Sequence, residues 1–309
     1  MAVNAGYYAL RVFTQAIVTI FIITVLIFGV TQALPGDVAT VIAGRSATPE
    51  VLATIREQLG LDRPILTQYV DWITGVLHGD FGTSMVNHDA VLPQLAERAV
   101  NTFVIAGISI VVVVILSIVL GMYAAWRRDR AADRIIFGAS VVGNAVPDFL
   151  VGAFLVFALA TYWLHWLPAV ATISPGELPW TAPKALVMPC LTMIIPGTAY
   201  LSRLVRAGFI DILDSPYIRM AMLKGIRPRA VLFRHALPNA LSAAVPAFSL
   251  VAAIMMGAVV VVEFLFNYPG VGGMLLTSIT TRDLPMLQAA GLLIGVVVYL
   301  LNLLADVLS

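Results

Sequence analysis

The stretch that decides the fold is TFVIAGISIVVVVILSIVLGMYAAW, at residues 102–126. It carries no charged side chain, and it exceeds the about 20 residues that a helix needs to cross the ~30 Å hydrocarbon layer of a bilayer. Its middle part, residues 108–115, is almost wholly β-branched. A lone strand in lipid would leave its backbone N–H and C=O groups unpaired. The sequence therefore predicts a transmembrane helix here.

Similar segments make up most of the chain. Of its 309 residues, 60% are hydrophobic and 11% are charged, which lies outside the range of soluble domains. Six segments are long enough to cross a membrane, at residues 12–30, 102–126, 135–163, 185–204, 237–266 and 287–308. The first is too long for a signal-peptide core and lacks an evident cleavage site, so we expect it to stay as an anchor. We predict an all-α, polytopic membrane protein with six transmembrane helices.

The positive charges predict the orientation. Twelve of the 18 basic residues fall on one side of this topology: Arg11, Arg127, Arg128, Arg130, Arg134, Arg203, Arg206, Arg219, Lys224, Arg227, Arg229 and Arg234. Basic loops stay inside, so we expect both termini in the cytoplasm. The protein is then expected in the plasma or inner membrane. Trp163, Trp166 and Trp180 are then expected at the outer interface and Trp126 at the inner one.

The domain organisation follows from these spans. We expect an N-terminal transmembrane helix at residues 1–30, a small extracytoplasmic helical region at 31–97, and a five-helix transmembrane domain at 98–309. In the outer region, Thr48, Pro49 and Glu50 suit the start of a helix that ends at Gly60, and residues 68–77 predict a second helix. Its acidic residues form either a solvated face or a docking surface for another protein: Asp37, Glu50, Glu57, Asp62, Asp71, Asp80, Asp89 and Glu97.

Between the fourth and fifth spans lies a basic hairpin, YIRMAMLKGIRPRAVLFRHALP at residues 217–238. Ser215 suits an N-cap and Pro216 the first helical position, Gly225 can take the left-handed conformation that ends a helix, and Pro228 starts a second one. An apolar stripe is flanked by basic side chains: Met220, Leu223 and Ile226, beside Arg219, Lys224 and Arg227. Such a hairpin either lies on anionic lipid or fits a groove on a cytoplasmic protein.

The hairpin resembles the Glu-Ala-Ala loop of binding-protein-dependent ABC importer permeases. That pattern reads Glu-Ala-Ala, three residues, Gly, nine residues, Ile, any residue, Leu-Pro. Its second Ala, its Gly and its Leu-Pro correspond to Ala221, Gly225, Leu237 and Pro238. Arg219, Met220 and His235 stand where the pattern has Glu, Ala and Ile. These departures bear on the salt bridge of the missing Glu, not on the helix–Gly–helix geometry, and Arg at the first position is common in the peptide and nickel branch.

Further segments resemble dipeptide and oligopeptide permeases, in the same order over nearly the whole chain. They are LGLDRP at 59–64, QYVDW at 68–72, HGDFGTS at 78–84, GAVVVVEFLFNYPGVGG at 257–273 and RDLPMLQ at 282–288. The chain departs from the relatives at residues 302–309, where a short tail containing Asp-Pro is absent.

The resemblance implies a type I ABC importer permease: a transport subunit, not an enzyme, that carries di- or oligopeptides or related small solutes. It implies a second homologous permease, two cytoplasmic ABC ATPase subunits or domains, and an extracytoplasmic solute-binding protein. The coupling loop would be residues 207–238, with the ATPase-coupling side chains Tyr217, Arg219, Ala221, Lys224, Gly225, Arg229, Leu237 and Pro238.

ATP and Mg²⁺ would belong to the partner subunits, and we expect this chain to bind no cofactor or metal. A phosphate-binding loop needs Gly-Lys-Ser/Thr, whereas Lys184 and Lys224 are followed by Ala185 and Gly225. The net charge of +1 argues against a nucleic-acid binder.

Polar residues in the spans are candidates for the substrate pathway. Asp148 follows Pro147, which weakens the hydrogen-bond ladder of the third span, and Asn144 is expected one turn earlier on the same helical face. They either line the pathway and contact amide or amine groups of the cargo, or they bond another span. Glu263 borders the outer gate by resemblance, and the alternative for it is a structural contact at a helix end.

Other functions leave the basic hairpin unexplained. A secondary transporter or channel usually has several intramembrane carboxylates or broken-helix ion sites, and Asp148 alone makes a thin relay. An intramembrane hydrolase is disfavoured because no His-Glu-x-x-His or Gly-x-Ser-x-Gly motif occurs. The motifs leave two questions open. Peptide, nickel-chelate and glutathione carriers share them, and the second permease is either an identical copy or a different chain.

Overall fold

The structure is a computed structural model that describes residues 5–33, 39–40, 48–58, 60–174 and 176–308. Asp37, Arg45 and Leu59 lie outside the described residues. The described part is helical and has no β-strand beyond an isolated bridge between Thr83 and Ala90, so the all-α prediction is confirmed. Contacts group the chain into two units. Unit 1 comprises Met1–Ala99 and Val271–Val296, and unit 2 comprises Val100–Gly270 and Val297–Ser309.

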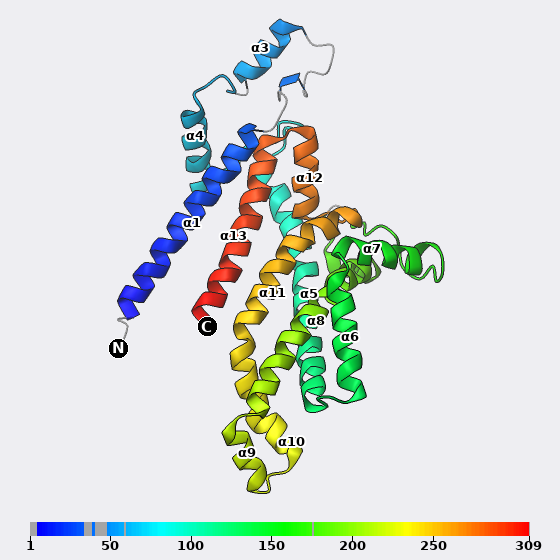
Figure 1. Ribbon diagram of the computed structural model, residues 1–309. Helices are drawn as coiled ribbons and strands as arrows, with labels where there is room; N and C mark the ends of the chain where they lie inside the picture. The colour runs from blue at the N-terminus through cyan, green and yellow to red at the C-terminus, as the bar shows by residue number, and fades with distance from the viewer. Residues whose placement is uncertain (1–4, 34–38, 41–47, 59, 175, 309) are drawn as a thin grey trace. The chain divides into compact units, whose positions relative to one another are not determined.

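Unit 1 is a small helical assembly (Figure 1). Its elements are α1 (Ala5–Ala33), α3 (Pro49–Gln58), α4 (Ile65–Leu77), α12 (Val271–Thr281) and the first turns of α5 (Val91–Trp126) and α13 (Leu284–Leu308). Val91, Leu95, Met274 and Ala290 are buried in its core. The helices predicted from Thr48 to Gly60 and at residues 68–77 are present as α3 and α4, and Gly60 has a positive φ of 65°.

Small residues let α13 approach α1 closely in unit 1. Gly291 and Gly295 lie four residues apart and so share a helix face. A Cβ at Gly295 would lie 3.0 Å from Cγ2 of Ile23, and one at Gly291 would lie 3.7 Å from Ile27. This is the packing of small residues at four-residue spacing that is common between transmembrane helices.

Sequence segments that resemble permeases meet each other in unit 1. Ser84, from HGDFGTS, donates a hydrogen bond to the Asp283 carboxylate of RDLPMLQ, and the backbone N–H of Met85 donates to the other carboxylate oxygen.

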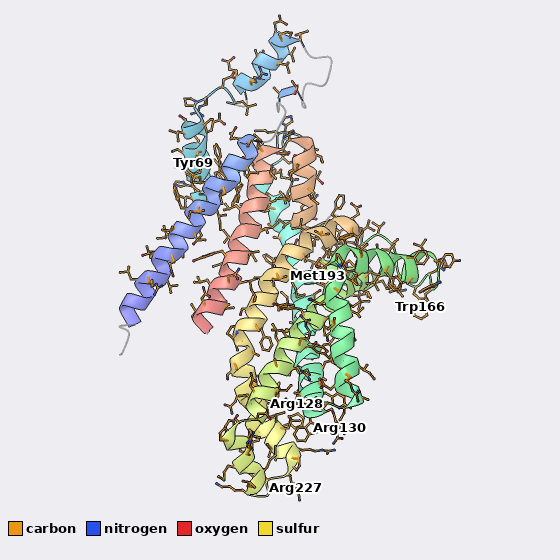
Figure 2. The ribbon with its side chains drawn as sticks, viewed as in Figure 1. Tyr69, Arg128, Arg130, Trp166, Met193 and Arg227 are labelled. Carbon is orange, nitrogen blue, oxygen red and sulfur yellow. The ribbon has the colours of Figure 1, made fainter. Side chains whose placement is uncertain are left out.

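Tyr69 of α4, labelled in Figure 2, contacts the rings of Phe28 and Trp72, and its hydroxyl forms a hydrogen bond with the hydroxyl of Thr24 at 2.9 Å. These contacts fasten α4 to α1.

Unit 2 is built around α8 (Pro183–Leu213) and α11 (Leu237–Leu265), which pack against each other. The other elements follow one another along the chain: α6 (Ala131–Ala145), α7 (Asp148–Leu155), the π-helix η1 (Val156–Thr161), the 3₁₀ turn η2 (Pro179–Thr181), α9 (Pro216–Leu223), α10 (Pro228–Ala230) and the π-helix η3 (Val231–Ala236). Leu201, Val205 and Val259 are fully or almost fully buried in the core. Within the described residues, five helices are long and apolar enough to cross a membrane, or six if α6 and α7 together form one span.

The third predicted span, residues 135–163, is not one helix. It consists of α6 and α7, which are bent by 100° with respect to each other. Val146, the residue before Pro147, adopts an extended conformation with φ −88° and ψ 124°. A residue that precedes proline avoids the α-helical region, and proline lacks the N–H that would continue the hydrogen-bond ladder. The predicted span is therefore present as two helices with a sharp break at Pro147.

Candidate functional site

The hairpin between α8 and α11 has the predicted helix–Gly–helix geometry. Pro216 starts α9, and Gly225 has a φ of 78°, the left-handed conformation that ends the helix. Ser215 occupies the N-cap position, but its hydroxyl donates backwards to the carbonyl of Ile212 and makes no cap hydrogen bond. Figure 1 shows α9 and α10 beyond the ends of α8 and α11.

One face of α9 is buried and the opposite one is open. Ile218 and Ala221 pack into the core of unit 2. Met220 is 53% and Leu223 82% exposed, whereas Ile226 is half-buried, so the predicted apolar stripe is open only at its first two members. Five basic side chains around it are exposed: Arg219, Lys224, Arg227, Arg229 and Arg234.

The remaining residues of the predicted coupling set join the hairpin to α11. The exposed Tyr217 accepts a hydrogen bond at its hydroxyl oxygen from Nδ2 of Asn239, at 3.0 Å. Leu237 is half-buried and Pro238 lies in the first turn of α11. Before them, η3 has the wider turns of a π-helix, which often marks functional sites in helices.

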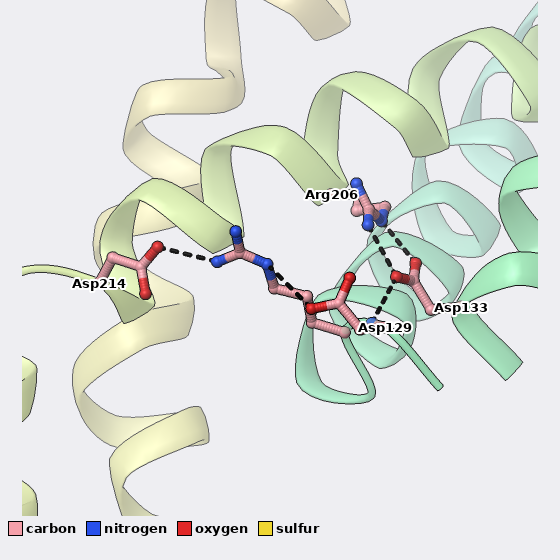
Figure 3. Close-up of polar contacts among 5 residues, drawn as sticks. Asp129, Asp133, Arg206 and Asp214 are labelled. Carbon is pink, nitrogen blue, oxygen red and sulfur yellow. Dashed lines mark hydrogen bonds and ion pairs between the residues drawn. The ribbon is translucent and has the colours of Figure 1, made fainter. Parts of the chain in front are cut away.

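A network of charged residues lies at the base of the hairpin (Figure 3). Arg206 of α8 donates two hydrogen bonds to Asp133 of α6, from Nε at 2.6 Å and from Nη2 at 2.7 Å. Asp133 is only 3% exposed and also accepts from the backbone N–H of Asp129 at 3.0 Å. Paired N–H···O bonds between arginine and a carboxylate fix geometry as well as charge. The pair therefore ties the start of α6 to α8.

A second ion pair reaches the hairpin itself. Nη1 of Arg128, in the loop after α5, lies 2.9 Å from Oδ2 of Asp214, the residue that follows α8. Both side chains are about half exposed, which limits what the pair contributes to stability. Figure 2 shows Arg128, Arg130 and Arg227 at one end of unit 2, with Trp166 well away from them. Sequence patterns gave Asp133 no signal beyond its position in the arginine-rich segment RRDRAADR at 127–134.

The bend between α6 and α7 forms part of the wall of a cavity of about 560 Å³ in unit 2. Asn144 and Asp148 both line it, together with Met193 and Tyr200 of α8 and Met255 of α11. Met193 is labelled in Figure 2. The two polar residues do not share a helical face as predicted, because α6 ends at Ala145 and Asp148 begins α7. The break in the helix brings both to the same cavity.

Glu263 lies elsewhere in unit 2. It is fully buried, and one of its carboxylate oxygens accepts a hydrogen bond from the Thr102 hydroxyl at 2.6 Å. A Cβ added at Gly270 would overlap this carboxyl group. Nearby, the Tyr268 hydroxyl donates to the carbonyl of Asn101 at 2.9 Å, and burial together with the charge of Glu263 raises the pKa of Tyr268. Glu263 is not among the described residues that line the cavity.

Among the described residues, no three His, Cys, Asp or Glu side chains are grouped so that they could hold a metal ion. The site consists of a hairpin that can transmit motion and a cavity with polar groups in its wall. An exposed apolar and basic hairpin is joined through α8, α11 and the Asp133–Arg206 pair to the walls of a cavity that contains one carboxylate.

Comparison with known proteins identifies this arrangement. Residues 117–309 match the family model of the binding-protein-dependent transport system inner membrane component, and residues 7–106 match the model of the N-terminal part of such membrane components. The probable peptide ABC transporter permease protein y4tP of Sinorhizobium fredii is 36% identical over 303 residues, covering 97% of this chain and 96% of that protein. The glutathione transport system permease protein GsiC of Escherichia coli K12 is 36% identical over 301 residues, covering 97% of this chain and 95% of that protein.

Members of this family are multi-pass membrane proteins that work with an ATPase and a substrate-binding protein. The chain belongs to the family of inner-membrane components of binding-protein-dependent transport systems, and it is a permease subunit of an ABC importer and not an enzyme.

Proposed function

We propose that this permease imports peptides or related small solutes, and that the hairpin at 207–238 receives the motion of a cytoplasmic ATPase. A second permease completes the pathway, two ABC ATPase subunits bind ATP and Mg²⁺, and a solute-binding protein delivers the cargo. The relatives named for peptide and glutathione transport support a cargo of this class. Residues 1–30 are then the N-terminal membrane helix, 31–97 the extracytoplasmic region and 98–309 the permease domain.

The orientation is inferred from charge. Exposed arginines and lysine gather on the hairpin and in the loop after α5, whereas the exposed Trp163, Trp166 and Trp180 lie in or next to the segment between α7 and α8. Basic loops remain in the cytoplasm and tryptophans favour interfaces. Both termini are thus assigned to the cytoplasm and residues 31–97 to the outer side, where exposed acidic side chains such as Asp62 and Asp89 face the binding protein.

The coupling role rests on one observation about α9. Its exposed face presents Met220 and Leu223 among basic side chains, and its buried face packs into the core of unit 2. An apolar helical stripe with flanking charges suits a groove on another protein. Because α8 and α11 flank the hairpin and also line the cavity, a displacement of α9 moves the cavity walls. The Asp133–Arg206 pair extends this motion to α6, whose far end carries Asn144.

The pathway is assigned to the cavity that Asn144 and Asp148 line. A cavity of ~300–1,000 Å³ with a few polar groups in an apolar wall is typical of small-molecule sites. Glu263 is kept as a residue of the outer side, where the hydrogen bond that it accepts from Thr102 joins α11 to α5.

The decisive test of coupling is Gly225→Val in the reconstituted complex. A β-branched side chain resists a φ of 78°, at a cost of about 1–3 kcal/mol, so uptake should fall about tenfold or more while ATP hydrolysis continues. Gly225→Asn is the conservative variant, because Asn tolerates this conformation. Gly107→Val, at an exposed helical glycine of α5 with equal free space and outside the hairpin, is the matched control. If Gly225→Val complexes import cargo like the wild type, the coupling role of this turn is wrong.

A further inference from the structure

The cavity at the α6–α7 bend has a one-sided charge. Asp148 is the only side chain in its described wall that is charged at neutral pH, and no Lys, Arg or His lies there. The other polar side chains are those of Asn144 and Tyr200. The rest of the wall is apolar, with Met193, Ile254 and Met255 as its largest members. A bound solute would therefore meet one negative charge in a mainly apolar surrounding.

The polar groups of this wall are available to a ligand. In the described part of the chain, Asn144, Asp148 and Tyr200 make no side-chain hydrogen bond or ion pair. They come from three elements, α6, α7 and α8, and face one cavity. A partly buried carboxylate without a counter-ion is costly in an apolar span, and such residues usually mark substrate or ion pathways.

Other acidic residues of the chain, unlike Asp148, have hydrogen-bond or ion-pair partners. Asp133 has Arg206, and Asp283 has the Ser84 hydroxyl and the backbone N–H of Met85. Glu263 accepts from Thr102. Each of these carboxylates is almost completely buried and has partners within its own unit. Asp148 is half-buried and stays unpaired beside an open volume.

We propose that this cavity selects the cargo by charge, and that Asp148 is the specificity-determining residue. Its carboxylate accepts hydrogen bonds from a protonated amine of a peptide or related amino compound. Asn144 and Tyr200 bond neighbouring amide groups, and the flexible thioethers of Met193 and Met255 accommodate varied apolar side chains. A solute whose amine is acylated leaves the carboxylate unpaired and is disfavoured. The inference rests on the proposed function, because the cavity must lie on the import pathway.

The first experiment measures uptake by proteoliposomes that contain the complete complex with its binding protein. The cargoes are leucyl-alanine and N-acetyl-leucyl-alanine, each at a concentration that saturates the binding protein. Asp148→Asn should lower uptake of the free amine about tenfold, which is the contribution of one hydrogen bond to a charged group. It should leave the acetylated cargo within about twofold, since no charge is paired there. Selection by the binding protein is the same for both permeases and cancels in the comparison.

Two further variants serve as controls for Asp148→Asn. Asp148→Glu keeps the charge and should retain much of the preference for the free amine. Glu177→Gln removes an exposed carboxylate of unit 2 that does not line the cavity, and should leave the ratio of the two cargoes unchanged. An unchanged ratio in Asp148→Asn would overturn the inference while leaving the proposed function intact. If the wild-type complex itself takes up neither cargo with ATP, the proposed function fails instead.

A second experiment needs no binding protein. Ile254 is exposed in the cavity wall, and Cys190, the single cysteine of the chain, is buried. In the permease–ATPase complex carrying Ile254→Cys, leucyl-alanine at millimolar concentration should slow maleimide labelling at that position. N-acetyl-leucyl-alanine should not, and Asp148→Asn should abolish the protection. Equal protection by both compounds, or protection that survives Asp148→Asn, would contradict the assignment of Asp148.

Discussion

Asp133, near the start of α6, and Asp148, just beyond its end, are two carboxylates in one broken span, and their surroundings differ in kind. Asp133 is 3% exposed and accepts three hydrogen bonds, two of them from Arg206. Asp148 is half-buried, lines a cavity and has no partner of its own. A paired buried carboxylate fixes the position of helices, whereas an unpaired one at a cavity is free to bind a ligand.

The separation of the two carboxylates also suits the proposed mechanism. About eleven residues of helix lie between Asp133 and Asn144, which corresponds to about 16 Å along α6. One end of α6 is fixed to α8 next to the hairpin, and the other end supplies a wall of the cavity. In the proposed mechanism, the ion pair lies at the end of α6 next to the hairpin, and the unpaired polar groups lie at the end that contacts the cargo.

Asp133→Ala should have the largest effect on stability. The substitution leaves the Arg206 guanidinium without its partner in a mostly buried place, and breaking a buried pair in this way costs about 3–5 kcal/mol. The measurement is the thermal midpoint of the purified complex in lipid. Asp148→Ala is the matched control at the other end of α6 and should change the free energy of unfolding by less than about 0.5 kcal/mol.

The double variant Asp133→Ala/Arg206→Met tests whether the unpaired Arg206 charge causes the loss of stability in Asp133→Ala. Removing both charges should recover much of the loss, because an apolar replacement of a buried pair is often close to neutral. If the two single variants Asp133→Ala and Asp148→Ala lower the thermal midpoint equally, the distinction between a structural and a ligand-binding carboxylate is wrong.

Gly270→Ala should have an intermediate effect, and it examines a third carboxylate. A methyl group at this position would overlap the carboxyl group of Glu263, which is fully buried and bonded to Thr102. Overpacking of a filled interior costs about 1–3 kcal/mol. Gly257→Ala is the control, since a Cβ there meets nothing within 4 Å. Equal thermal midpoints for both variants would show that the turn after α11 adapts freely.

Some features of this molecule could be predicted from the sequence, whereas others depend on the fold. Apolar length predicted the spans, and the helix–Gly–helix pattern predicted the hairpin, because both depend on local rules of hydration and backbone conformation. The φ of Gly225 follows from the same rules. The exposure of Met220 and Leu223 was visible in their spacing, but the partial burial of Ile226 depends on packing with the rest of unit 2.

Long-range pairs had no comparable signal. Asp133 and Arg206 lie 73 residues apart, and nothing in either local sequence names the other as its partner. The same holds for Ser84 and Asp283, 199 residues apart. Pro147 indicated a weakened helix, but a bend of 100° depends on the extended conformation of Val146 as well, so the shared helical face of Asn144 and Asp148 was not correct. The position of these two side chains at one cavity could be known only from the fold.

The smallest effect is expected at Glu50, a carboxylate of yet another kind, which is fully exposed and has only local partners in the first turn of α3. Hydrogen bonds from its own backbone N–H and from the Thr48 hydroxyl lower the pKa of Glu50 from its ordinary value of 4.5. A lowered pKa means that the ionised group stabilises the helix. That contribution is complete above 4.5 and is lost as the pH falls through the folded value. The protection factors of the α3 amides, which are their intrinsic exchange rates divided by the observed rates, should therefore fall below about pH 4.5 in the wild type, and Glu50→Gln should remove this pH dependence. An identical pH profile in both proteins would show that the capping contacts of Glu50 do not stabilise α3, and the contrast would then rest on buried carboxylates alone.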